Sequence, residues 1–302
     1  MTSMLDRPLK PRTFSPVSRR RRITNYVATL LVSLSLLVAV TPLVMVLWSV
    51  VVKGFKAIAS TTWWSHSQAG MTAFVTGGGA YHALVGTVLQ GLVCAVISIP
   101  LGLMVAIYLV EYGGTPLSRL ASFMVDILSG VPSIVAALFI YALCVATLGL
   151  SRSEFAVSLA LVLLMLPVIV RATEEMLRIV PEDLREASYA LGITKWKTIA
   201  RVVIPTGLSG IVTGILLAMA RVMGETAPLL ILVGYAQSMN FDIFSGFMGT
   251  LPGMMFNQTS AGASLNPIPT DRLWGAALTL ILVIATINVA ARVIARFLGA
   301  RK

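Results

Sequence analysis

Six long runs of apolar residues dominate this sequence and constrain its fold more than any other feature. They lie at about residues 24–52, 82–110, 124–148, 155–173, 207–235 and 273–295. A helix needs roughly 20 apolar residues to cross the hydrocarbon core of a bilayer, whereas the strands of a transmembrane barrel are short and alternate. Only 12% of the 302 residues are charged, against about 25% in soluble domains. The sequence therefore predicts an all-α membrane protein with six transmembrane helices.

The net charge of +11 is distributed unevenly along the chain. Lys and Arg gather before the first run, between the fourth and fifth runs, and after the last run. The opposite connections hold only Lys53, Lys56, Arg152 and Arg272. An even number of spans places the three basic regions on one side, which the positive-inside rule identifies as the cytoplasm. We therefore expect both termini in the cytoplasm, contact of the Arg run with membrane lipid, and no nucleic-acid partner.

Residues 1–22 combine three prolines with a run of Arg and have little to bury, so they are predicted to form a flexible basic cytoplasmic tail. Residues 23–302 are predicted to form one six-helix transmembrane domain. Cys94 and Cys144 lie inside apolar runs and are expected to be buried thiols rather than a disulfide or a metal pair. The sequence contains no phosphate-binding loop of the Gly-x4-Gly-Lys-Ser/Thr type and no catalytic triad. We therefore predict no catalytic residue, metal site or cofactor.

The connection between the fourth and fifth runs, at about residues 174–205, carries signals for two short helices. Pro181 suits the start of a helix, and the carboxylates of Glu182 and Asp183 follow in its first turn, where the helix dipole favours them. Gly192 is placed to end this helix. Thr194 can cap a second helix, which Pro205 is expected to limit. A loop with such signals is expected to dock on a partner, although a hairpin that merely joins two spans has the same helix signals.

The residues of this loop resemble a known motif. Glu186, Ala187 and Ser188, followed by Gly192 and then by Ile204 and Pro205, resemble the EAA loop of ABC importer permeases. Ser188 departs from that pattern, which has a second Ala, and Val-Ile before the proline is a second mild departure. In that family the loop presents a coupling helix to the ATP-hydrolysing subunit. The resemblance implies that Glu186, Ala187, Ser188 and Gly192 couple this chain to an ATPase.

Three further segments resemble the phosphate importer permeases within that family: Ser129–Val135, Arg171–Leu177 and Ala220–Pro228. The resemblance implies the type I ABC importer permease architecture and a location in the bacterial cell membrane. It also implies the partners of that family, which are a second related permease, two ATP-binding subunits and an external phosphate-binding protein. Any ATP hydrolysis is then expected on a partner subunit, and phosphate is the expected cargo.

Arg221 and Glu225 lie inside the fifth run, and charges at membrane depth are functional candidates by default. Their i,i+4 spacing predicts that both lie on one helix face. One interpretation is a structural ion pair. The other is a path for an oxyanion, in which the planar guanidinium of Arg221 binds phosphate. In that path Glu225 accepts a hydrogen bond from protonated phosphate or holds Arg221 when the cargo is absent, and the hydroxyl-bearing residues Thr226, Ser129 and Ser133 belong to the same path. Arg171, by contrast, is expected to snorkel to the inner surface.

Three functions therefore remain open at this stage. The first is the permease subunit of a phosphate importer, and the second is an importer permease for another oxyanion or small solute. The third is a channel or secondary transporter, a class that often shows inverted repeats and broken helices at the midplane. That class gives no reason for a capped cytoplasmic loop.

Overall fold

The computed structural model describes residues 18–263 and 265–298 of the chain. The chain divides into two units, Met1–Ser49 and Val50–Lys302. The described part of the first unit is helical. Helix α1 (Arg19–Ile58) begins directly after Ser18, whose side chain and carbonyl accept hydrogen bonds from the backbone N–H groups of Arg21 and Arg22. The last four residues of the predicted tail are therefore helical, since Arg is a good helix former and Ser is a good cap. The rest of the tail lies outside the described residues.

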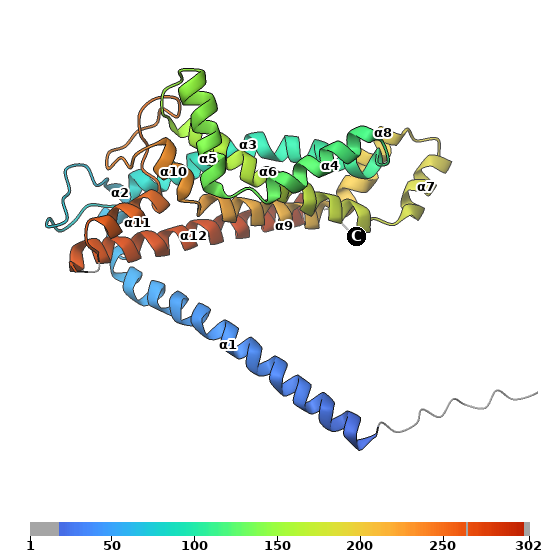
Figure 1. Ribbon diagram of the computed structural model, residues 1–302, viewed down its shortest axis with the longest axis horizontal. Coiled ribbons are helices and arrows are strands. Elements are labelled where there is room, and N and C mark those ends of the chain that lie inside the picture. The colour runs from blue at the N-terminus through green and yellow to red at the C-terminus, as the bar shows by residue number, and fades with distance from the viewer. Residues whose placement is uncertain (1–17, 264, 299–302) are drawn as a thin grey trace, which may run out of the picture. The chain divides into compact units, whose positions relative to one another are not determined.

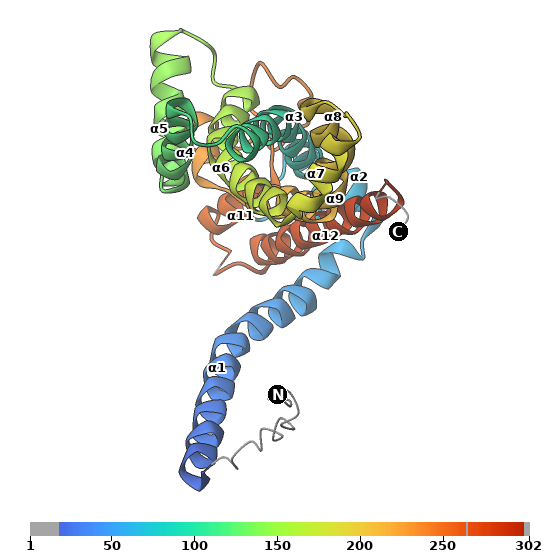
Figure 2. The ribbon, with the colours of Figure 1, turned by 90° about the vertical axis from the view of Figure 1, so that its right-hand side faces the viewer.

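Four long helices run side by side in the second unit (Figures 1 and 2). They are α3 (Tyr81–Glu111), α6 (Glu154–Ile179), α9 (Ile204–Met223) and α12 (Pro267–Leu298). Small residues bring them close together, as expected where van der Waals contact rather than burial from water drives helix association. A Cβ at Gly102 of α3 would lie 2.6 Å from Ile169 of α6, and one at Gly214 of α9 would lie 2.4 Å from the Cβ of Ala172. Helix α6 packs against both α3 and α9 and supplies more residues to the central core than any other helix.

Five described helices are long and apolar enough to cross a membrane: Arg19–Ile58, Tyr81–Glu111, Glu154–Ile179, Lys195–Met223 and Pro267–Val293. The predicted span 124–148 is not a single helix. It is replaced by α4 (Pro116–Ser129) and by α5 (Ser133–Ile140), which continues as a π-helical segment (Tyr141–Thr147), and the chain bends by 108° between the two parts. Pro132 lacks an N–H group and disfavours helical backbone at Val131, so the helix breaks there. The prediction of six spans holds when this bent pair counts as one.

The predicted span 207–235 is wrong at both ends. Its helix starts earlier, at α8 (Lys195–Thr198), and passes through a π-helical segment (Ile199–Val203) directly into α9. Pro205 therefore does not limit the second short helix, because the wider π turn accommodates a residue that cannot donate a hydrogen bond. At the other end α9 stops at Met223, and a separate short helix, α10 (Ala227–Leu232), follows. Pro228 cannot continue the hydrogen-bond pattern of α9, which explains this break.

Two short helices, α2 (Thr61–Ser65) and α11 (Leu251–Ser260), lie at the end of the second unit opposite to residues 182–198 (Figure 1). Arg272 is buried there, and its guanidinium donates to the carbonyl oxygens of Thr72, Val75 and Gly77, which fixes the intervening loop. The hydroxyl of Tyr235 donates to Gln68 Oε1 at 3.0 Å, and burial raises the pKa of this hydroxyl. Tyr235 therefore remains a neutral donor that joins two loops.

Candidate functional site

A cavity of about 220 Å³ brings together polar side chains from three helices that are far apart in sequence. Ser129 ends α4, Arg171 lies in the middle of α6, and Arg221 lies in the last turn of α9. The remaining lining residues are apolar: Leu128, Val131, Leu164, Pro167 and Val168. The structure therefore joins two of the residues that the sequence assigned to a transport path, Ser129 and Arg221, and adds Arg171.

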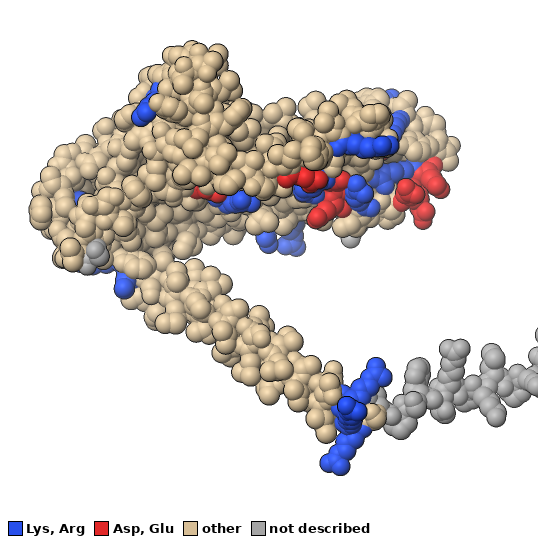
Figure 3. Space-filling view, in the orientation of Figure 1, with Lys and Arg blue, Asp and Glu red and all other residues tan. Residues whose placement is uncertain are grey.

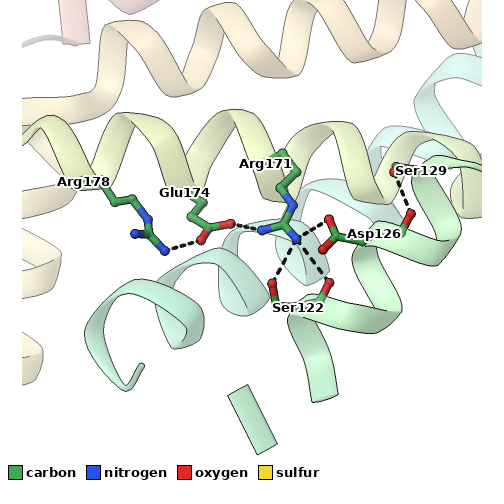
Figure 4. Close-up of polar contacts among 6 residues, drawn as sticks. All are labelled: Ser122, Asp126, Ser129, Arg171, Glu174 and Arg178. Atoms are coloured by element: carbon green, nitrogen blue, oxygen red, sulfur yellow. Dashed lines mark hydrogen bonds and ion pairs between the residues drawn. The ribbon is translucent and has the colours of Figure 1, made fainter. Parts of the chain in front are cut away.

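Arg171 is held in place by a network of hydrogen bonds and ion pairs (Figure 4). Its Nη2 donates to Asp126 Oδ1 at 2.5 Å and to Ser122 Oγ at 2.9 Å, and its Nη1 donates to Glu174 Oε2 at 2.5 Å. Glu174 in turn accepts from Arg178 Nη2 at 2.7 Å. The expectation that Arg171 snorkels to the inner surface did not include these partners. Its side chain is 32% exposed and points toward α4, where the two carboxylates and the serine fix it.

The sequence contained a signal for this network. Arg171, Glu174 and Arg178 follow one another at i,i+3 and i,i+4 spacing and so share a helix face. Asp126 lies near the start of the third apolar run, where a carboxylate needs a partner. The sequence alone could not show that Asp126 of α4 faces Arg171, because this contact arises only from the tertiary structure.

Arg221 differs from Arg171 in its surroundings. Its side chain is exposed at the cavity, and no hydrogen bond or ion pair joins it to another residue in the described part of the chain. The cavity and its adjoining network thus hold three guanidinium groups against two carboxylates, those of Asp126 and Glu174. Such an excess of positive charge at a cavity attracts an anion.

The predicted pairing of Arg221 with Glu225 on one helix face is wrong. Glu225 follows the end of α9, and its carboxylate forms no ion pair among residues 18–263 and 265–298. The i,i+4 rule fails because the helix breaks at Gly224. Thr226 is the residue before α10, and Ser133 begins α5. Neither of these hydroxyl-bearing residues, nor Glu225, lines the cavity.

The second candidate site is the hairpin formed by α7 (Glu182–Ala190) and α8. Gly192 lies in the turn with a φ of +74°, a left-handed conformation that glycine adopts without cost. Its N–H donates to the carbonyl oxygen of Tyr189 at 2.9 Å. Ser188 is buried, and its hydroxyl lies 2.8 Å from that of Thr198, which ties α7 to α8. The sequence thus locates the first helix, the turn and the start of the second helix correctly, although the side chain of Thr194 forms no capping hydrogen bond and the second helix continues past Pro205.

Glu186, Ala187 and Gly192 are exposed on this hairpin, whereas Ser188 faces inward. Two large apolar side chains are also exposed there, Leu191 at 79% and Trp196 at 65%. Figure 3 shows acidic and basic side chains together over the half of the second unit that carries α7 and α8, while few are visible over the other half. Exposed apolar side chains among charges mark an interaction surface.

A bundle of apolar helices with one broken span, a basic cavity and a charged surface hairpin defines a polytopic membrane transport protein. The sequence profile of the family described as "Binding-protein-dependent transport system inner membrane component" matches residues 98–302, and the chain belongs to this family. It is therefore a transport subunit rather than an enzyme, a multi-pass permease of a bacterial ABC importer in the inner membrane. Membership implies ATPase, binding-protein and second-permease partners.

Three relatives and one solved structure show which members of this family the chain is similar to. The chain is 56% identical to "Phosphate transport system permease protein PstA 1" of Mycobacterium tuberculosis (strain CDC 1551 / Oshkosh), over 99% of this chain and 97% of the relative. It is 54% identical to the PstA protein of Mycobacterium leprae over 99% of this chain and 97% of the relative. It is 38% identical to that of Yersinia pestis over 91% of this chain and 90% of the relative.

Among solved structures, the fold is similar to a chain of the inward-facing MetNI methionine ABC transporter. The TM-score is 0.57 at 21% identity, with 74% of this chain and 95% of that chain covered. This similarity confirms the type I importer permease architecture.

Proposed function

We propose that this chain is the phosphate permease subunit of an ATP-driven importer and that the cavity between α4, α6 and α9 lies on the path of the anion. The observation that carries the proposal is the meeting of Arg171 and Arg221 at one cavity. The relatives named above are phosphate transport permeases, and this chain matches them along nearly their whole length, which supports phosphate as the cargo. The family rules out the channel and secondary-transporter alternatives.

The two arginines have different roles in this proposal. Arg171 is neutralised by Asp126 and Glu174, so it shapes the wall of the cavity. Arg221 has no partner among the described residues and supplies the charge that the anion meets. An oxyanion can leave water only where fixed charge or oriented donors replace its hydration, and a guanidinium offers two parallel donors to one phosphate. Ser129 adds a hydroxyl at the same cavity, although it donates to the carbonyl oxygen of Asp126 at 2.7 Å.

The hairpin is the second part of the proposed function. Glu186, Ala187 and Gly192, together with the exposed Leu191 and Trp196, form a surface that suits a groove in an ATP-binding subunit. The buried Ser188 supports this surface from inside. The assembly consists of this chain, a second related permease, two ATP-binding subunits and an external phosphate-binding protein. The hairpin and both termini face the cytoplasm, as the distribution of Lys and Arg favours.

The Arg221→Gln substitution tests the cavity. The complete complex is reconstituted in liposomes, and uptake of radiolabelled phosphate is measured with sulfate as competitor. Loss of a charge-assisted hydrogen bond is expected to lower uptake at least about ten-fold while the complex still assembles. Arg119→Gln is the matched control, because Arg119 is exposed and donates only to the Gly114 carbonyl oxygen at 3.4 Å.

The double variant Arg221→Gln with Glu225→Gln separates transport from structural pairing. The two residues do not pair within this chain, so the second substitution is expected to leave uptake as low as in the single variant. Restored uptake in the double variant would show that Arg221 is structural. Equal uptake of labelled sulfate by the unaltered complex would favour the alternative of a broader oxyanion permease.

A further inference from the structure

Arg185 of α7 connects three elements of the fold although its side chain is only 13% exposed. Its Nε and Nη2 both donate to Glu111 Oε1 at 3.2 Å, at the last residue of α3. Its Nη1 donates to the Val180 carbonyl oxygen at 2.8 Å, and its Nη2 donates to the Leu177 carbonyl oxygen at 3.0 Å. One guanidinium therefore joins the first helix of the hairpin to the ends of both α3 and α6.

The second helix of the hairpin reaches the same place. Lys195 begins α8, and its ammonium donates to the backbone carbonyl oxygen of Glu111. The same ammonium lies 4.2 Å from the centre of the Tyr112 ring, within the range of a cation–π contact. Glu111 thus accepts from α7 through its side chain and from α8 through its backbone.

Electrostatics favours cations at this position. The last carbonyl groups of a helix have no partner within the helix and carry the negative end of its dipole. Arg185 and Lys195 neutralise that end on α6 and α3 respectively. The side chain of Glu111 is nevertheless only 5% exposed, and a buried ion pair is a weak source of stability. The fixed geometry of the Arg185–Glu111 pair therefore indicates its role better than its contribution to stability does.

The covalent link between α6 and α7 is too short and too extended to transmit force as a helix does. It consists of Val180 and Pro181, both with extended backbone and ψ angles of 122° and 138°. Without the Arg185 contacts, α7 could pivot about this link independently of α6. Arg185 binds the carbonyl group of Leu177 in α6 and that of Val180 within the link, so its guanidinium bridges from α7 across the link to α6.

We propose that Arg185 and Glu111 form the junction through which the hairpin moves as one body with the ends of α3 and α6, so that Arg185 is a positioning residue for transport. This inference rests on the proposed function, in which the hairpin receives force from an ATP-binding subunit. Helix α6 also carries Arg171, six residues before Leu177, which is about 9 Å along a helix. A displacement of the hairpin therefore reaches the cavity through α6.

The Arg185→Lys substitution tests the junction in the complete complex. Lysine keeps the charge but lacks the planar fork that reaches Glu111 and two carbonyl groups together. We expect ATP hydrolysis to continue while the number of phosphate ions imported per ATP falls about ten-fold. Arg201→Lys is the control, because Arg201 is exposed on the same segment and contacts no described residue through a hydrogen bond or ion pair. A wild-type ratio of phosphate to ATP in Arg185→Lys would overturn the proposal.

A covalent rescue distinguishes a junction from a simple helix cap. Glu111→Cys and Arg185→Cys are combined in a chain whose native Cys94 and Cys144, both buried, are replaced by Ala. A flexible thiol-reactive cross-linker between the two new cysteines is expected to restore the ratio of phosphate to ATP, whereas the uncross-linked chain remains uncoupled. Failure of the cross-link to restore the ratio would show that Arg185 matters only as a cap.

A final measurement is independent of the cargo. Spin labels at Asp183→Cys on α7 and Gly113→Cys beyond the end of α3 report the distance between the two elements. A narrow distribution in the unaltered chain and a broad one in Arg185→Lys are expected, and equal distributions would overturn the proposal. If the unaltered complex imports no phosphate while the labels respond as expected, the proposed cargo fails and the junction stands.

Discussion

Glu174→Gln removes the carboxylate that links the two arginines of α6. The Glu174 side chain is 8% exposed and accepts from Arg171 at 2.5 Å and from Arg178 at 2.7 Å. Glutamine has nearly the same shape and keeps one carbonyl acceptor, so the substitution changes charge and leaves volume almost unaltered. The variant is expected to unfold more easily than the unaltered chain.

The size of the effect follows from how exposed each partner is. Removing one member of a fully buried ion pair costs about 3–5 kcal/mol, and a net hydrogen bond to a charged group contributes about 1.5–3 kcal/mol. The Arg178 side chain is 65% exposed, so its bond to Glu174 contributes little. Arg171 is 32% exposed and keeps Asp126 and Ser122 as partners. The free energy of unfolding is therefore expected to fall by about 2 kcal/mol, near the lower end of these ranges.

The measurement is unfolding of the purified chain in mild detergent by titration with a denaturing detergent, followed by tryptophan fluorescence. Glu175→Gln is the control: the neighbouring carboxylate is exposed, and within the described residues it forms no ion pair or hydrogen bond. Its unfolding free energy is expected to stay within about 0.5 kcal/mol of the unaltered chain. Equal losses in the two variants would refute the network as a source of stability.

Two further predictions concern the hairpin and the topology. Gly192→Ala forces a side chain onto a φ of +74° but meets no neighbouring atom within 4 Å, so the cost is backbone strain of about 1–2 kcal/mol. Phosphate uptake by this variant should fall. The control is Gly114→Ala, which has a φ of +87° and equally open space but lies outside the hairpin, so it should retain uptake. Equal uptake by the two variants would contradict a coupling role for the turn. For the topology, an impermeant thiol reagent should label Phe74→Cys in intact cells and Glu182→Cys only after lysis. Labelling of residue 182 from outside would place the hairpin on the wrong side of the membrane.

Most of the helical bundle was predictable because apolarity is a local property of the sequence. The runs at 82–110 and 155–173 agree closely with Tyr81–Glu111 and Glu154–Ile179. Broken helices were harder to place. The breaks at Pro132 and after Met223 both interrupt predicted spans, because Pro132, Gly224 and Pro228 lie in otherwise apolar stretches. A run of apolar residues thus predicts membrane depth better than it predicts helix continuity.

The sequence predicted a residue of the candidate site only where the identity and local context of that residue were sufficient. Arg221 was identified because an arginine in an apolar run has a high cost, and the turn at Gly192 because glycine often ends a helix. Arg171 was misjudged because its partner Asp126 is 45 residues away in sequence. Arg185 was not singled out for the same reason, since Glu111 is 74 residues away. Contacts of this kind arise from the fold and have no local signature.

Helix α6 is suited to connect the cavity with the hairpin because of where its proline lies. Pro167 removes one hydrogen bond from the helix and weakens it locally. It lines the cavity and precedes Arg171, so this weak point is on the side of Arg171 that faces away from the hairpin. Between Arg171 and the end of the helix at Ile179 there is no proline or glycine. The segment that joins the cavity to the carbonyl groups bound by Arg185 therefore keeps its backbone hydrogen bonds, and any bending of α6 is expected at Pro167 rather than within this segment.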